Sequence, residues 1–220
     1  MDGQDLKGST VLSIKRLSRY LTHLRFLRKT GTKEGFSASQ LGRDLCIHET
    51  QVRKDLALTG LEGRPKTGHS IEEAIEAIEK YFNIGDTSEA FLVGVGHLGT
   101  AILGYHSRKN SHPSGIKIVA AFDNDDSKIG KTIHGIKVLA IDKITDLSNR
   151  MHISIGIICT PPEAAQGIAD MLVEGGVKAI WNFSPVGLTL PESIVLENSD
   201  IEQGAAFLKR RLTEQKRGKK

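Results

Sequence analysis

A glycine pattern between two apolar runs constrains the fold of this chain more than any other feature. Gly94, Gly96 and Gly99 follow the apolar residues 91–93 with the spacing G-x-G-x-x-G, and the next apolar run suits a helix. In such a strand–turn–helix, the first glycine permits the tight turn, the second lets a pyrophosphate approach the backbone, and the third lets the helix pack on the strand. Free N–H groups at the helix N-terminus attract the phosphates. The pattern therefore predicts a dinucleotide-binding loop.

The residues after this loop continue the pattern of a dinucleotide-binding domain. A parallel strand is predicted over residues 117–123, and Asp123 at its end lies about 20 residues beyond the glycines, where a carboxylate binds the ribose hydroxyls. A glycine-rich turn without a ligand is the alternative. Three further strands are predicted within residues 131–140, 153–159 and 177–183, and a helix is predicted over 162–174. This alternation predicts a Rossmann-like α/β domain with a doubly wound parallel sheet and right-handed crossovers.

The first 60 residues have the apolar spacing of three helices. The first helix is predicted over Val11–Lys29, and a second, ending near Leu45, is opened by the S-x-x-Q capping box that begins at Ser37. The third is predicted over His48–Leu58. Two short helices after a longer one indicate a helix-turn-helix.

Four polar residues lie off the apolar face of the third helix: Thr50, Gln51, Arg53 and Lys54. Arginine and glutamine suit the edges of guanine and adenine in the major groove, and lysine suits phosphate. The glycine-rich residues 60–69 have the composition of a wing, with Arg64 and Lys66 at its tip. These features predict an N-terminal winged helix-turn-helix that binds double-stranded DNA, and a three-helix bundle with an ordinary loop is the alternative.

Charge is distributed unevenly along the chain. Residues 1–70 carry 13 Lys and Arg against 7 Asp and Glu, whereas residues 71–206 carry 10 against 18. Residues 207–220 form a basic tail with 7 against 1. A basic head beside an acidic nucleotide domain favours a polyanionic partner for the head, and a solvated surface is the alternative.

Several classes of protein are not expected. No apolar run approaches the length that spans a bilayer, and the N-terminus lacks the pattern of a signal peptide, so we expect a cytoplasmic protein without a membrane partner. Cys46 and Cys159 have no metal-binding spacing, and no metal site is predicted. Cys159 is interpreted as a small buried residue rather than a redox centre.

Two more helices complete the predicted architecture. An amphipathic helix over residues 71–82 is expected to bridge the domains, and a last helix from Ile201 to about Leu212 carries an apolar stripe. The predicted divisions are a DNA-binding domain over 1–83, an NAD(H)-binding domain over 87–198, and a C-terminal helix with a basic tail over 199–220.

Several motifs together resemble the Rex family of redox-sensing transcriptional repressors. The matching segments are 15–17, 51–56, 94–101, 122–123, 127–130, 164–166 and 182–185. The resemblance implies a homodimer that binds operator DNA, takes NAD(H) as its cofactor and leaves the DNA when NADH binds. It also implies that the C-terminal helix is exchanged between subunits. The cofactor site predicted on these grounds comprises Gly94, Val95, Gly96, His97, Leu98, Gly99, Asp123, Lys128, Thr160 and Pro161.

The family couples its nicotinamide to DNA through an arginine, a tyrosine and an aspartate, and the matching residues are Arg16, Tyr105 and Asp200. This chain departs from the family pattern in the wing, where Pro65 lies among the basic residues and His69 replaces a tyrosine. The resemblance therefore does not predict the operator sequence.

A small NAD-dependent dehydrogenase is the main competing function. It would need a proton-transfer group beside the nicotinamide, for which His97 and His106 are candidates, and a substrate domain, for which no residues are left. A CoA- or nucleotide-binding module is a third possibility, because CoA-binding folds use the same loop. A repressor without enzymatic activity is the predicted function.

Overall fold

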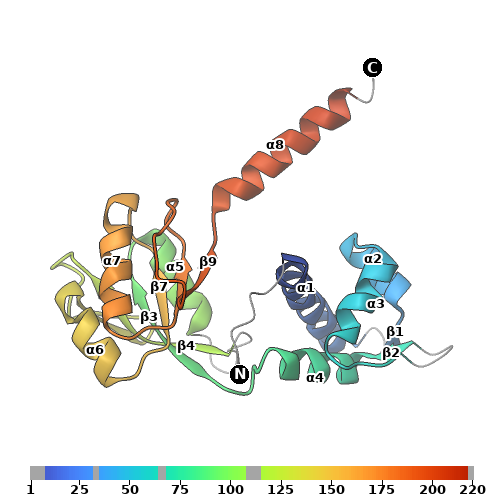
Figure 1. Ribbon diagram of the computed structural model, residues 1–220, viewed down its shortest axis with the longest axis horizontal. Coiled ribbons are helices and arrows are strands. Elements are labelled where there is room, and N and C mark those ends of the chain that lie inside the picture. Colours follow the sequence, from blue (N-terminus) through green and yellow to red (C-terminus); the bar gives the residue numbers. More distant parts are fainter. Residues whose placement is uncertain (1–7, 32–34, 64–67, 108–114, 218–220) are drawn as a thin grey trace. The chain divides into compact units, whose positions relative to one another are not determined.

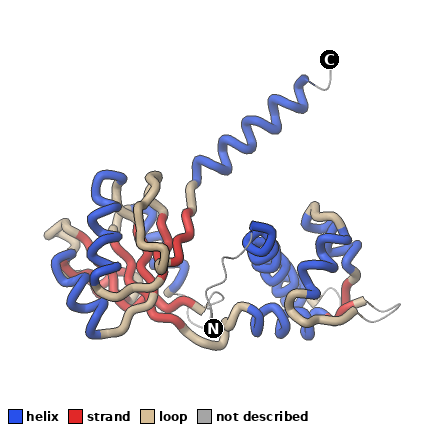
Figure 2. The backbone as a smooth tube through the Cα atoms, in the orientation of Figure 1, coloured by secondary structure: helices blue, strands red, loops and turns tan. Residues whose placement is uncertain are grey.

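The computed structural model describes residues 8–31, 35–63, 68–107 and 115–217. The chain divides into two compact units, Met1–Asp86 and Thr87–Lys220, whose helices and strands are shown in Figures 1 and 2. The predicted wing-tip residues Arg64 and Lys66 lie outside the described residues.

The first unit contains helices and one short β-ribbon in its described residues. The elements in chain order are α1 (Gly8–Thr30), β1 (Gly35–Phe36), α2 (Ala38–Leu45), α3 (Glu49–Ala57), β2 (His69–Ser70) and α4 (Ile71–Tyr81). Strands β1 and β2 pair antiparallel, and β2 begins at His69, the last residue of the predicted wing. The predicted helix-turn-helix is confirmed as α2 and α3, and α1 extends one residue or more beyond its predicted ends.

Local capping sets the ends of the two short helices. The Ser37 side chain accepts a hydrogen bond from the Gln40 N–H, as the capping box predicts, and Cys46 ends α2 in a left-handed conformation at φ 56°. The His48 side chain accepts the Thr50 N–H at the start of α3. These caps leave a turn of three residues between the two helices.

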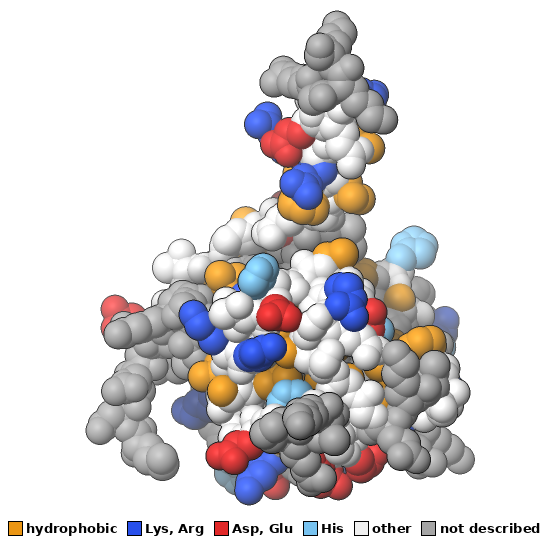
Figure 3. Space-filling model, turned by 90° about the vertical axis from the view of Figure 1, so that its right-hand side faces the viewer, with side chains coloured by type: hydrophobic (Ala, Val, Ile, Leu, Met, Phe, Trp, Pro, Cys, Tyr) orange, Lys and Arg blue, Asp and Glu red, His pale blue; other side chains and the backbone are white. Residues whose placement is uncertain are grey.

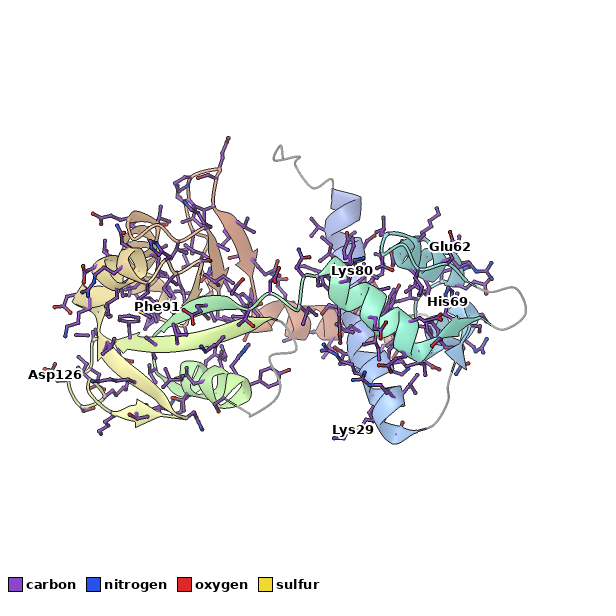
Figure 4. All side chains as sticks on the ribbon, turned by 90° about the horizontal axis from the view of Figure 1, so that it is seen from below. Lys29, Glu62, His69, Lys80, Phe91 and Asp126 are labelled. Carbon is purple, nitrogen blue, oxygen red and sulfur yellow. The ribbon has the colours of Figure 1, made fainter. Side chains whose placement is uncertain are left out.

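The apolar faces of α1, α2, α3 and α4 share one core. Its fully buried side chains include Leu17, Tyr20, Leu24, Leu41, Val52, Leu56, Ile75 and Ile78. Figure 4 labels Lys29 near the end of α1 and Lys80 on α4, the two long helices of this unit. Burial of this apolar surface is the main source of the unit's stability.

The second unit contains a seven-stranded sheet among its described residues. The strands are β3 (Ser88–Val93), β4 (Ile116–Asp123), β5 (Thr132–Ile133), β6 (Ile136–Ala140), β7 (Ile155–Ile158), β8 (Ala179–Asn182) and β9 (Val195–Asn198). Their order is β5-β6-β4-β3-β7-β8-β9, and every pairing is parallel except β5 with β6. The expected doubly wound α/β sheet is confirmed.

Helices cover both faces of this sheet, and alternate residues of β3 face each layer. Phe91 and Val93 pack with α6 (Ile144–Arg150) and α7 (Pro162–Glu174). Leu92 packs with α5 (His97–His106) on the other face. Figure 4 labels Phe91 within the sheet. Burial on both faces explains why β3 is an almost continuous apolar run.

Some elements differ from the sequence-based expectation. The 3₁₀ turn Ile141–Lys143, helix α6 and the edge strand β9 were not predicted. The last helix, α8, runs from Ile201 to Arg217, beyond the predicted end near Leu212. The side chains of residues 202–216 are all exposed, and they include the large apolar residues Phe207, Leu208 and Leu212.

Candidate functional site

The glycine loop lies between β3 and α5, where each glycine meets a different environment. Gly94 has φ +95°, and a Cβ there would lie 2.7 Å from the Cys159 carbonyl oxygen. A Cβ on Gly99 would collide with the Gly94 carbonyl oxygen. Packing inside the protein therefore requires glycine at both positions, as the sequence pattern predicts.

Packing within the protein does not explain why residue 96 is a glycine. Its backbone is extended, with φ −82° and ψ −160°, and a Cβ would meet no protein atom within 4 Å. It is the N-cap of α5 and makes no side-chain capping bond. Open space beside uncapped helix N–H groups fits the approach of a phosphate.

The sheet order places this loop at a topological switch point. Strand β3 lies between β4 and β7 in the sheet. After β3, the chain passes through α5 to β4 on one side of β3, and it returns through α6 to β7 on the other side. The Gly94 N–H donates to the Phe122 carbonyl, and the Cys159 N–H donates to the Val93 carbonyl, each at 2.8 Å. The carboxyl ends of three strands therefore meet at the glycine loop, which is where open α/β sheets bind ligands.

Asp123 ends β4 and holds the glycine loop in place. Its carboxylate accepts the Val95 N–H at 2.8 Å and the Asp125 N–H at 2.9 Å, and it lies 3.2 Å from the Lys128 ammonium group. Partial burial lowers the pKa of Lys128, but its bonds to Asp123 and Asp125 outweigh this and raise it. The sequence predicted a ribose-binding acid here but not its second role as a brace between β4 and the loop.

The remaining predicted cofactor residues surround the same edge of the sheet. His97 is exposed at the start of α5, Leu98 is half-buried beside it, and Pro161 is the N-cap of α7. Among the described residues, the buried hydroxyl oxygens of Thr160, after β7, and Ser184, after β8, have no hydrogen-bond partner. Because buried polar atoms are normally paired, these hydroxyls fit a polar ligand at this edge.

Cys159 lies next to Thr160 but is not a reactive thiol. Burial raises its pKa to about 12. A thiol with so high a pKa is a poor nucleophile at neutral pH. In the part of the chain that the structure describes, no cluster of His, Cys, Asp and Glu could hold a metal ion.

The helix-turn-helix presents most of its predicted DNA-contacting residues to solvent. Thr50, Arg53 and Lys54 are exposed on α3, and Arg53 makes a 3.6 Å ion pair with Glu49 of the same helix. Figure 3 shows a face of the molecule on which Lys and Arg side chains are scattered among acidic, hydrophobic and uncharged groups. Such an exposed ion pair is weak and leaves the arginine available for a base or a phosphate.

Gln51 differs from these residues, because its side chain already has a partner. Its Nε2 donates to Asp55 Oδ1 at 2.9 Å. Asp55 is fully buried, and its carboxylate also accepts Arg16 Nε at 2.6 Å, Arg16 Nη2 at 2.9 Å and the Tyr20 hydroxyl at 2.8 Å. No spacing or motif in the sequence predicted this cluster.

The hydrogen bonds in this cluster decide its charge state. Burial alone raises the pKa of Asp55, but the bonds from Arg16, Gln51 and Tyr20 outweigh it and hold that pKa below its ordinary value. The hydrogen bond to Asp55 raises the pKa of Arg16, while burial and the same carboxylate raise the pKa of Tyr20. Asp55 is therefore an ionised carboxylate inside the first unit's core.

Each of the three predicted switch residues has its own local contacts within its unit. Arg16 lies on α1, where its guanidinium group pairs with the Asp55 carboxylate. The Asp200 carboxylate accepts a hydrogen bond from the Glu202 N–H at the start of α8. Tyr105 lies on the last turn of α5 with an exposed fraction of 58%.

Two family models match consecutive parts of the chain. A model described as "Putative DNA-binding protein N-terminus" matches residues 12–57, and one described as "CoA binding domain" matches residues 86–186. They correspond to the helix-turn-helix unit and to the sheet with its glycine loop. No described helix is both long and apolar enough to cross a membrane.

Curated relatives cover nearly the whole chain. A protein of Treponema denticola named "Redox-sensing transcriptional repressor Rex" is 37% identical over 89% of this chain and 91% of its own length. One of the same name from Bacteroides thetaiotaomicron is 34% identical over 91% of this chain and 89% of its own.

Solved structures are similar over the same extent. RSP, described as a Rex-family repressor, superposes with a TM-score of 0.84 at 32% identity, over 95% of this chain and 97% of its own. RSP with β-NAD⁺ and operator DNA, and RSP with β-NADH, each give a TM-score of 0.83 at 32% identity, again over 95% of this chain. The superposed residues make up 94% of the RSP chain bound to β-NAD⁺ and operator DNA and 96% of the RSP chain bound to β-NADH.

Proposed function

Because this chain belongs to the Rex family of redox-sensing transcriptional repressors, we propose that it binds operator DNA through α2 and α3 and releases it when NADH occupies the glycine loop. One observation carries the proposal: a single chain joins a helix-turn-helix to a sheet whose glycine loop is open only at Gly96. Relatives with both parts are named repressors rather than enzymes, which disfavours the dehydrogenase alternative.

The proposed NAD(H) site uses the residues gathered at the sheet's switch point. Gly94, Gly96 and Gly99 and the N-terminus of α5 would hold the phosphates, and Val95, His97 and Leu98 complete this loop. Asp123 and Lys128 hold the adenosine ribose, and Thr160 and Pro161 border the nicotinamide half. When bound, NADH supplies the reduced nicotinamide that distinguishes it from NAD⁺, and the protein responds to that difference by releasing DNA.

The proposed switch passes through Arg16, Tyr105 and Asp200 in a homodimer bound to a palindromic operator. Arg16 already has one carboxylate partner in Asp55, so a second carboxylate can compete for its guanidinium group. A charged set with two arrangements can act as a switch between domain orientations. A change in orientation would alter the spacing of the two recognition helices relative to the half-sites.

The direct test is retention on DNA. Labelled duplexes selected from a random pool by the full chain are titrated with NADH, NAD⁺ and CoA. We expect release by NADH alone. Binding that no nucleotide changes, or release by CoA instead, would contradict the proposal.

Asp123 should make the site prefer NADH to NADPH by about tenfold or more, because a phosphate on the ribose would face the carboxylates of Asp123 and Asp125. Lys128 neutralises only one of these charges. We expect Asp123→Asn to reduce the ratio of the NADH affinity to the NADPH affinity. Both affinities are measured by calorimetry. The control is Asp126→Asn, an exposed position in the same loop labelled in Figure 4, which should leave the ratio unchanged. Equal affinities in the unmodified protein would refute the assignment of Asp123.

Arg53→Ala should cost about 1–3 kcal/mol of operator affinity and relax the preference at one base pair, because Arg53 is exposed on the recognition helix. Lys54→Ala should weaken binding to all DNA sequences alike. It should also lower the slope of log affinity against log salt concentration by about one. Both effects are measured by fluorescence anisotropy at several salt concentrations. Lys80→Ala on α4 removes the same charge outside the helix-turn-helix and should change neither. If Arg53→Ala and Lys54→Ala behave like Lys80→Ala, α3 does not read DNA.

A further inference from the structure

The buried carboxylate of Asp55 is an unusual feature of the first unit. In the described part of this unit, Ser13 and Asp55 are the buried polar or charged residues, and Asp55 is completely inaccessible. A buried charge is costly unless it is paired. Arg16 Nε and the Tyr20 hydroxyl both donate to Asp55 Oδ2. The chain keeps this charge on its recognition helix, one turn beyond Gln51.

The bonds around Asp55 fix the orientation of the Gln51 amide. An ionised carboxylate only accepts hydrogen bonds, so the group of Gln51 that faces it must be the NH₂ group. Asp55 Oδ1 also accepts Arg16 Nη2, and Arg16 Nη2 donates in turn to the Ser13 hydroxyl. The carboxylate is thus held from α1 and cannot follow Gln51 if that side chain rotates.

This orientation leaves two groups of Gln51 for another partner. One N–H is bound to Asp55, while Oε1 and the second N–H remain. Adenine presents a donor and an acceptor side by side in the major groove, and a glutamine amide pairs with both. An amide already fixed in place loses less conformational entropy when it pairs with a base.

We propose that Asp55 is a positioning residue that holds the Gln51 amide in the orientation that reads adenine. The inference rests on the proposed function, since it requires α3 to enter the major groove. Asp55 itself touches no DNA, and it acts through Gln51 while Arg16 and Tyr20 hold its carboxylate in place.

The test compares base preference, not only affinity, because a merely structural role would weaken all sequences equally. The full chain selects its site from random duplexes, and each base pair of that site is then varied. We expect Gln51→Leu and Asp55→Asn to reduce discrimination at the same adenine by about tenfold. The double variant should be no worse at that position than either single variant. Thr59→Val is the matched control, because it removes a side-chain hydrogen bond to the Leu56 carbonyl just after the same helix without touching Asp55 or Gln51. It should leave the preference unchanged.

A second measurement covers the case in which Asp55→Asn fails to fold. In the unmodified protein, NMR should show slower hydrogen exchange for the side-chain amide of Gln51 than for that of Gln203, which is exposed on α8. Equal exchange rates would overturn the proposal, as would a uniform loss of affinity in Asp55→Asn. If Arg53→Ala relaxes one position while Gln51→Leu changes none, this inference fails and the proposed function stands. If the unmodified chain selects no DNA, the proposed function itself fails.

Discussion

Gly96→Val should abolish NADH binding, with at least ~100-fold weaker affinity, and leave the second unit folded. The reason is that valine tolerates the extended backbone at this position, and its side chain would enter space that no protein atom occupies within 4 Å. Only a ligand that approaches the α5 N-terminus would collide with it. Binding can be followed by energy transfer from Trp181, the single tryptophan in the chain, and folding by thermal unfolding.

A matched control separates this effect from a general effect of valine. Gly167 lies on α7, and a Cβ there would likewise meet no atom within 4 Å, so Gly167→Val should bind NADH normally. Gly99→Val should behave differently from both, because the collision with the Gly94 carbonyl destabilises the fold itself. NADH binding by Gly96→Val within a few-fold of the unmodified protein would place the cofactor elsewhere.

Much of the nucleotide site could be predicted from sequence because its signals are local. Gly94, Gly96 and Gly99 lie within six residues, and their spacing reflects one turn whose geometry the structure confirms at Gly94 and Gly99. Ser37 and Gln40 likewise reveal a helix start within four residues. Such patterns need no knowledge of distant parts of the chain.

The features that sequence analysis missed depend on distant residues or lack a periodic pattern. Asp55 looks like any polar residue of a short helix, and its partner Arg16 lies 39 residues earlier. Strand β9 is mostly exposed and short, so no alternation of apolar residues marks it. The second role of Asp123 depends on a bond to Val95, 28 residues away, that forms only when β3 and β4 pair. Tertiary pairing creates these contacts, so local propensity cannot reveal them.

Truncation after Asp200 should remove the dimer and lower operator affinity at least ~100-fold, because a monomer engages one half-site without the gain from a linked second contact. The structural reason is α8, whose large apolar side chains Phe207, Leu208 and Leu212 are exposed by 63%, 63% and 58%. Leu208 and Leu212 lie four residues apart and share one face of the helix. An apolar face on a lone helix requires a covering surface, and a second copy of the chain supplies it in the proposed homodimer. Sedimentation velocity measures the assembly, and anisotropy measures the affinity.

Truncation also removes basic residues, so a second variant must keep the charge. Replacing Phe207, Leu208 and Leu212 together by serine preserves every Lys and Arg of α8 and removes only the apolar side chains. If the dimer depends on the apolar face, this variant should dissociate as the truncated chain does. The other outcome is that the serine variant stays dimeric and only the truncated chain binds DNA more weakly. In that case, the basic tail contacts phosphate and α8 is peripheral to assembly. The two variants therefore distinguish a helix that joins subunits from a tail that adds charge.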